Sequence, residues 1–207
     1  MDESQKENFN HLKIHSQYSI CEGAIKIDDL KEFSKENKLR ALGLCDTSNL
    51  CGALEFAEKI SKSGTQPIIG TQINFKYGDT TGLLPLYALD EEGYKKIIEL
   101  SSLSFLNNDE LSDPHLDIKE LLTECKGVAL FSGTVNGLFG RLFDKGKSKE
   151  IFELYSKLHS IHKNNFYVET QRHGDQNEES FEKFNLEKSL EIKIPLIATN
   201  EVYYLSS

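Results

Sequence analysis

The sequence has no tryptophan, no long apolar run and no excess of basic residues, and each absence argues against a class of function. No stretch of its 207 residues approaches the ~20 apolar residues that a transmembrane helix needs. The first eight residues are polar and acidic, without the basic and apolar regions of a secretory signal peptide. We therefore expect a soluble cytoplasmic protein that makes no contact with a membrane.

The charge balance argues against a nucleic-acid-binding module. Lys and Arg number 24 against 33 Asp and Glu, which gives a formal net charge of -9. A surface of this sign repels a phosphate backbone. The 12 Phe stand at core-like positions, and they are not interleaved with basic residues as in a base-stacking platform. A short basic run at residues 145–149 is flanked by acids, which favours a solvated turn. We expect no strong DNA binding by this chain alone.

The cysteines and the length point to one reduced intracellular domain. No CxxC pair occurs, so reduced, partly buried thiols are favoured over disulfides or zinc ligands at the four cysteines, Cys21, Cys45, Cys51 and Cys125. A chain of 207 residues with 38% hydrophobic content suits one mixed domain with a substantial core. We assign residues 1–8 to a polar lead and residues 9–207 to the domain.

Short apolar runs alternate with amphipathic helical segments along the chain. Strands are predicted at residues 11–16, 41–46, 67–75, 83–89, 128–132, 166–170 and 195–200. Helices are predicted at residues 27–38, 50–63, 91–105, 118–125, 138–144, 149–161 and 178–191, with a polar loop at 107–116. Strands that alternate with helices favour parallel pairing, and this pattern predicts an α/β barrel, with a doubly wound open sheet as the alternative.

Several chemically useful side chains stand at or just beyond the predicted strand ends, where the active sites of α/β barrels lie. They are His15, Asp46, Gln72, Thr134, His173 and Glu201. Lys13 and His15 are two residues apart on a strand, so their side chains point to one face. A His-x-His pair there would clamp a metal ion, but the charged amine of Lys13 has no lone pair to offer.

Seven short motifs, in one order along the chain, carry a family resemblance. The first, His-Leu-Lys-Ile-His-Ser-Gln-Tyr-Ser, begins at His11 and is followed by Glu22 and Gly23. The others lie at residues 41–53, 66–72, 90–94, 131–134, 166–174 and 198–205. Together they resemble the PHP (polymerase and histidinol phosphatase) domain of bacterial replicative polymerases. The resemblance implies a distorted, TIM-barrel-like (β/α)7 barrel of the PHP type.

The resemblance also implies a metal cluster whose ligands are largely replaced in this sequence. The family's ligands would be His, His, Glu, His, Cys, Asp and His at the positions of Lys13, Thr47, Gln72, Leu83, Thr134, Glu201 and Tyr203. Usable chemistry remains at His15, Glu22, Asp46 and His173, and Glu201 is still acidic. Multinuclear hydrolysis needs several preorganised ligands close together. We therefore expect a vestigial site with no catalytic residue and no bound metal, with His15, Asp46, His173 and Glu201 as weak candidate ligands.

One substitution suggests how the lost cation is replaced. We hypothesise that the Lys13 ammonium lies near Asp46 or Glu22 and supplies positive charge that a metal would otherwise supply. His173, in a loop beside an arginine, is equally compatible with a functional role and with holding the strand end.

The function implied by the resemblance is that of the N-terminal domain of a DNA-directed DNA polymerase, truncated here before the rest of the chain. Such a domain would support the polymerase core and dock a separate proofreading exonuclease, while the Mg²⁺ site for synthesis would lie outside this chain. The alternatives are an active metal-dependent phosphoesterase or 3′-5′ exonuclease, and a free-standing adaptor that binds only the exonuclease.

Overall fold

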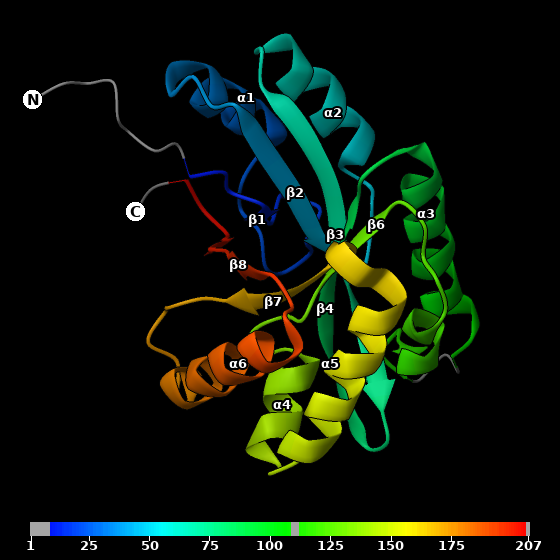
Figure 1. Cartoon of the computed structure of the whole chain (residues 1–207). Coiled ribbons are helices and arrows are strands. Elements are labelled where there is room, and N and C mark those ends of the chain that lie inside the picture. Colours follow the sequence, from blue (N-terminus) through cyan, green and yellow to red (C-terminus); the bar gives the residue numbers. More distant parts are fainter. Residues whose placement is uncertain (1–8, 109–111, 206–207) are drawn as a thin grey trace, which may run out of the picture.

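A computed structural model describes residues 9–108 and 112–205 (Figure 1). The predicted polar lead at residues 1–8 lies outside the described residues. The strands are β1 (Lys13–Ile14), β2 (Ala41–Thr47), β3 (Gln66–Tyr77), β4 (Thr80–Ala88), β5 (Leu116–Asp117), β6 (Val128–Phe131), β7 (Phe166–Thr170), β8 (Leu196–Ala198) and β9 (Glu201–Val202). The helices are α1 (Ile27–Glu36), α2 (Ala53–Lys62), α3 (Glu91–Leu106), α4 (Leu138–Asp144), α5 (Ser148–His162) and α6 (Glu178–Ile192), with 3-10 turns η2 (Ile118–Leu122) and η3 (Lys163–Asn165).

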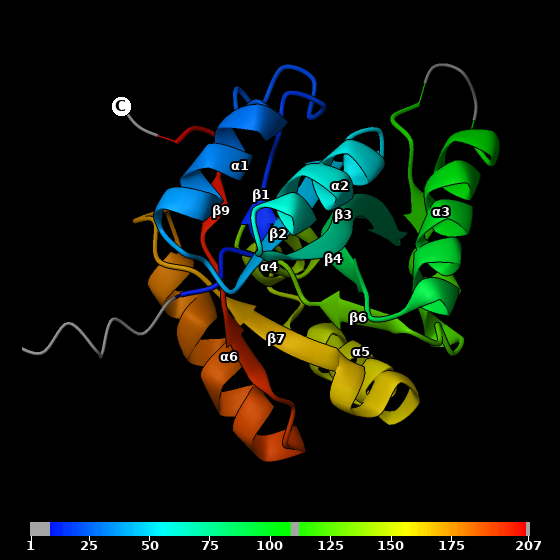
Figure 2. The same ribbon diagram turned by 90° about the horizontal axis from the view of Figure 1, so that it is seen from above.

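The strands form one curled sheet in the order β8-β7-β6-β4-β3-β2-β1-β9, with β5 beside β3. Only residues 199–200 separate β8 from β9, yet β8 pairs with β7 and β9 pairs with β1. The chain itself therefore joins the two ends of the sheet. When β8 and β9 are taken as halves of one interrupted strand and the two-residue β5 is left out, the described part of the chain contains the seven strands of a distorted α/β barrel, as predicted. Helices α1, α2, α3, α5 and α6 lie outside the curl (Figure 2).

The expectation of parallel pairing throughout was wrong for β4, which runs antiparallel to both β3 and β6. Only two residues, Gly78 and Asp79, separate β3 from β4, and Gly78 has a φ of 61°. A parallel connection needs a crossover of a dozen or more residues, whereas a two-residue turn with positive φ makes a hairpin. Residues 76–82 are mostly polar, so the apolar pattern ended before the turn and did not indicate a hairpin.

Smaller corrections concern the ends of the elements. Strand β5 lies at the end of the segment predicted as a loop at 107–116, and the helix predicted at 118–125 is the short 3-10 turn η2. The last predicted strand, 195–200, is split into β8 and β9. All four cysteines are free, with Cys45 and Cys125 buried and Cys21 and Cys51 exposed.

Side chains along a strand alternate between two environments, the helices that pack outside the sheet and the barrel interior. On β2, Leu42 and Leu44 pack with α1 and α2 in one hydrophobic cluster. Cys45 points to the other face and packs with Tyr87 and Phe131 from β4 and β6 inside the curl. Side chains at successive strand positions point to opposite faces, so the parity of a residue decides whether it meets the helices or the barrel interior.

Candidate functional site

The barrel interior holds a buried cluster of charged side chains centred on Lys13. The Lys13 Nζ atom lies 3.5 Å from Oε1 of Glu169 and 3.5 Å from Oε2 of Glu201. Lys13 is 2% exposed and Glu169 is 1% exposed. Lys13 on β1 is the register partner of Glu201 on β9, so these two side chains share one face of neighbouring strands. Glu169 reaches the same ammonium from β7.

Besides the Lys13 ammonium, the side chains of His15 and Gln72 lie within hydrogen-bond distance of the Glu201 carboxylate. Nε2 of His15 lies 2.9 Å from its Oε1 atom, and Nε2 of Gln72 donates to the same oxygen at 3.4 Å. The His15 ring stacks on Tyr203, with ring centroids 4.5 Å apart and an angle of 12° between the planes. His15 Nδ1 also lies 3.3 Å from the hydroxyl oxygen of Ser19. The imidazole is thus held on both edges and one face by protein groups.

Glu169 has hydrogen-bond partners at only one of its two carboxylate oxygens. Its Oε1 atom accepts hydrogen bonds from the Thr199 hydroxyl and, at 3.2 Å, from Nε2 of Gln171. Its Oε2 atom is buried and has no hydrogen-bond partner among the described residues. A buried carboxylate with one oxygen unsatisfied relies strongly on a nearby cation, and here that cation is Lys13.

The pKa shifts favour the charged forms of the pair. Burial alone would lower the pKa of Lys13, but the charges of Glu169 and Glu201 outweigh it and raise that pKa. Burial alone would raise the pKa of Glu201, yet the hydrogen bond from His15 and the charge of Lys13 lower it to about 2. Burial, followed by the charge of Glu201, raises the pKa of Tyr203, so its phenol stays protonated. The cluster therefore contains a true ion pair.

The acid dependence of stability should report this ion pair. The folded-state pKa of Glu201 is about 2, below its ordinary value of 4.5, so its stabilisation is present above pH 4.5 and is lost as the pH falls towards 2. The difference in unfolding free energy between the native chain and Glu201→Gln should shrink by up to about 3 kcal/mol over that range. Urea unfolding at a series of pH values measures it. A control, Glu92→Gln on the exposed start of α3, should give a difference that changes little with pH.

The hypothesis that Lys13 pairs with Asp46 or Glu22 was wrong, because its partners are Glu169 and Glu201. Asp46 has the parity of Leu42 and Leu44 on β2, and so it faces away from the interior. Its carboxylate accepts the Ser16 N–H at 2.7 Å, the Ser16 hydroxyl at 2.8 Å and the Ser19 hydroxyl at 2.8 Å. It acts as the anchor of the loop that follows β1.

A chain of hydrogen bonds connects the surface to the ion cluster. The Thr47 hydroxyl donates to Oε2 of the exposed Glu22 at 2.5 Å, and it accepts from Nε2 of Gln72 at 3.1 Å. Gln72 in turn reaches Glu201. Three positions where the family resemblance implies metal ligands, Thr47, Gln72 and Glu201, are thus joined by direct hydrogen bonds.

The remaining candidate positions lie around this cluster rather than in it. Thr134 lines a small hollow with Glu169 beside the start of α6, and Leu83 is half-buried on β4. His173 is exposed, and its backbone N–H donates to Glu178 at 2.9 Å. Among the described residues, no hydrogen bond or ion pair involves the His173 side chain. The contact of this residue is made by its backbone, so neither of the two roles expected for the imidazole has a side-chain contact behind it in the described residues.

The sequence reasoning missed Glu169, Gln171 and Thr199. The signal for Glu169 was available, because an acidic residue within an apolar strand is expensive to bury unless it is paired. Its partner Lys13 is remote in sequence, so the pairing itself could not be read from the local pattern.

The donor set does not fit a metal ion. The space between the carboxylates of Glu169 and Glu201 is taken by the Lys13 ammonium, which carries three donors and no lone pair. Across residues 9–108 and 112–205, no group of three or more His, Cys, Asp and Glu side chains is arranged to hold one. His15, Asp46 and Glu22 are each held by other protein hydrogen bonds.

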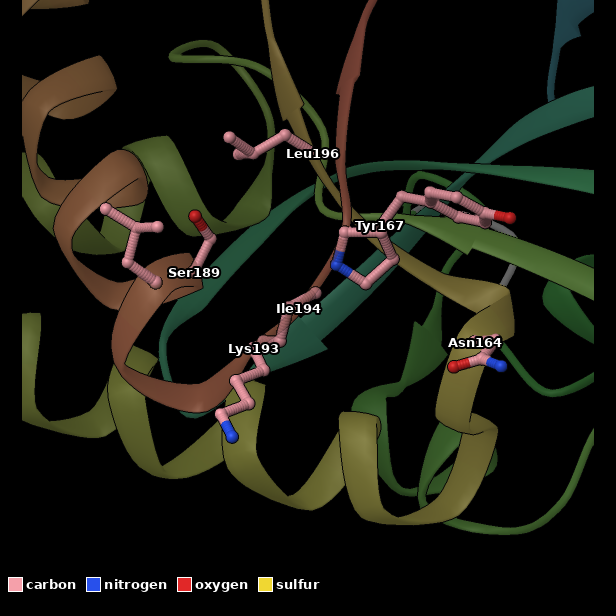
Figure 3. A pocket seen from close by; sticks show the side chains of 8 residues that line it. Asn164, Tyr167, Ser189, Lys193, Ile194 and Leu196 are labelled. Atoms are coloured by element: carbon pink, nitrogen blue, oxygen red, sulfur yellow. The ribbon is translucent and has the colours of Figure 1, made fainter.

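A hollow of about 570 Å³ elsewhere on the surface lacks comparable chemistry (Figure 3). It lies where α6, β7 and β8 meet, with Tyr167, Ile194 and Leu196 on its walls. No carboxylate, histidine or cysteine is among its described lining residues. In the same described part of the chain, no helix is both long and apolar enough to cross a lipid bilayer.

Comparison with known proteins agrees with this architecture. The sequence profile of the PHP domain matches residues 11–173. DNA polymerase III subunit alpha of Caulobacter vibrioides is 35% identical over 212 residues, and that of Rickettsia felis is 35% identical over 200 residues. These alignments cover 99% and 96% of this chain. A crystal structure from Bifidobacterium adolescentis, provisionally assigned as a metal-dependent phosphoesterase, superposes with a TM-score of 0.50 at 11% identity, covering 94% of this chain and 88% of the other.

The alignments cover nearly all of this chain but only a small part of each polymerase subunit. The chain spans 18% of the length of the Caulobacter protein and 17% of the Rickettsia protein. The structural match, at its low identity, supports the fold alone. The extent of the family match and the identity to the polymerase subunits lead to one conclusion: this chain belongs to the PHP domain family and is homologous to the N-terminal region of DNA polymerase III subunit alpha.

Proposed function

We propose that this chain is the PHP domain of a cytoplasmic DNA polymerase III alpha chain and that it acts as a structural support without hydrolytic activity. The observation that carries the proposal is the Lys13 ammonium between Glu169 and Glu201. A covalently attached cation is always present beside the two carboxylates, whereas a metal would have to be bound from solution. The barrel interior would then keep a positive charge beside its acids without metal.

The proposal includes two partners. One is the remainder of the polymerase chain, because the relatives are between five and six times as long as this domain. The other is a separate proofreading exonuclease, which the domain would dock. Mg²⁺ for nucleotide transfer belongs, in this proposal, to a polymerase site outside this chain. Co-elution of the purified chain with the exonuclease subunit in size-exclusion chromatography tests the second partner, and separate elution at micromolar concentrations contradicts it.

A second candidate is a metal-dependent phosphoesterase or 3′-5′ exonuclease. The observation that favours it is the fold shared with the Bifidobacterium protein, together with the potential ligands His15 and Glu201 in the barrel interior. The presence of Lys13 and Gln72 at ligand positions argues against it, because a charged amine cannot bind a cation and a neutral amide brings no negative charge to one.

Metal analysis separates the two functions. The chain is incubated with Zn²⁺ or Mn²⁺ and dialysed, and its bound metal is measured by mass spectrometry. The same sample is then assayed for hydrolysis of p-nitrophenyl phosphate and of a single-stranded oligonucleotide. We expect metal well below one ion per chain and no hydrolysis that EDTA abolishes. Stoichiometric metal with EDTA-sensitive hydrolysis would establish the second function instead.

A further inference from the structure

Away from the ion cluster, a hollow of about 670 Å³ opens on the outer surface of the barrel. It lies where the end of β3 meets β5, η2 and α5, and both β3 and α5 contact η2. Its volume falls within the range of pockets that bind small ligands or the side chains of a peptide. The metal-site motifs do not contribute to it.

The hollow combines an apolar floor with a basic rim. Tyr77, Leu122 and Leu154 line it from three different elements. Lys76 and Lys157 stand beside them, and neither amine makes a hydrogen bond or an ion pair within residues 9–108 and 112–205. Such unpaired cations next to apolar surface are available for a ligand that brings negative charge.

The charged residues that line the hollow carry a net positive charge, whereas the chain as a whole is negative. Three lysines, Lys76, Lys119 and Lys157, line the hollow against two acids, Asp117 and Glu153, although the whole chain carries -9. Lys119 approaches Asp117 only at 3.9 Å, with both side chains largely exposed.

The turn between α4 and α5 brings two more lysines to the neighbouring β3–β4 hairpin tip. Lys145 and Lys147 lie 3.3 Å and 3.0 Å from the single carboxylate of Asp79. An acidic partner would therefore meet attractive charge at this site and repulsion over most of the remaining surface.

We propose that this hollow binds an acidic peptide segment of a partner protein, with an apolar side chain on the floor and carboxylates at Lys76 and Lys157. The apolar floor favours a peptide over a nucleic-acid strand, because a phosphodiester backbone would contact the lysines but bring nothing to bury against the half-buried Tyr77 and Leu122. Salt should weaken the interaction, because the rim lysines are exposed.

Fluorescence anisotropy with the 207-residue chain tests the proposal. The probe is a short fluorescein-labelled peptide of Asp and Glu around a central Leu-Phe pair. The charge-reversed double variant Lys76→Glu/Lys157→Glu should bind it about tenfold or more weakly, because the new carboxylates repel those of the peptide. The control, Lys26→Glu/Lys126→Glu, changes the net charge equally at exposed positions outside the hollow and should bind as the native chain does.

Three further arms make the result decisive. Replacing the Leu-Phe pair with Gly-Ser, or the acids with Gln, should each abolish most of the binding. An oligothymidylate should fail to compete. The proposal is overturned if the acidic peptide does not bind, if both double variants weaken it equally, or if oligothymidylate displaces it, which would make the hollow a nucleic-acid contact.

Discussion

Replacing Lys13 with methionine is expected to lower the free energy of unfolding by about 3–5 kcal/mol, the range for removing one partner of a buried ion pair. Methionine fills a similar volume, so the loss comes from charge. Without the ammonium, Glu169 and Glu201 would be two like charges in the barrel interior, and the Oε2 atom of Glu169 already has no hydrogen-bond partner among the described residues. Urea unfolding followed by circular dichroism measures the change.

A triple variant distinguishes charge from packing. Lys13→Met combined with Glu169→Gln and Glu201→Gln removes all three charges, and it should recover most of the lost stability, since neutral replacement of a buried ionic group is often tolerated. If Lys13→Met alone does not fold, the triple variant still tests the explanation. Lys126→Met, at an exposed turn, should change stability by no more than about 0.5 kcal/mol. A Lys13→Met loss below about 1 kcal/mol would contradict the assigned role of the cluster.

Removing the Asp46 carboxylate should have the second large effect. Asp46→Ala leaves the Ser16 N–H and the Ser16 and Ser19 hydroxyls without their acceptor in a site where Asp46 is 1% exposed. Hydrogen bonds to a charged group contribute about 1.5–3 kcal/mol each. Because the three bonds share one carboxylate and do not add independently, we expect a total loss of about 3–5 kcal/mol. Thermal and urea unfolding report it.

The role of Asp46 can be separated from metal binding by a chelator. As an anchor of the loop after β1, Asp46 should give the same loss on replacement by alanine with and without EDTA. A loss that disappears in EDTA would identify Asp46 as a metal ligand. Asp29→Ala, at an exposed position in the first turn of α1, removes a carboxylate of the same kind and should cost about 0.5 kcal/mol.

The elements with a clear period were predictable from the sequence. Helix α4 and strand β7 occupy the predicted residues, α3 and α6 are each one residue longer at the C-terminal end, and α5 is one residue longer at both ends. Their amphipathic spacing is a local property that survives folding. The β3–β4 hairpin was not predictable in the same way, because its strands continue through polar residues that lack the apolar pattern.

The sequence by itself determined the family and the order of the main strands and helices. Only the tertiary structure decided what Lys13 does. Its partners lie 156 and 188 positions away, and their distance from Lys13 depends on β1 pairing with β9 and on the direction in which β7 points Glu169. Electrostatic pairing depends on separation in space, whereas the pattern along a chain specifies only which face a side chain takes. For that reason Asp46, which is chemically suitable but lies on the opposite face, is not the partner.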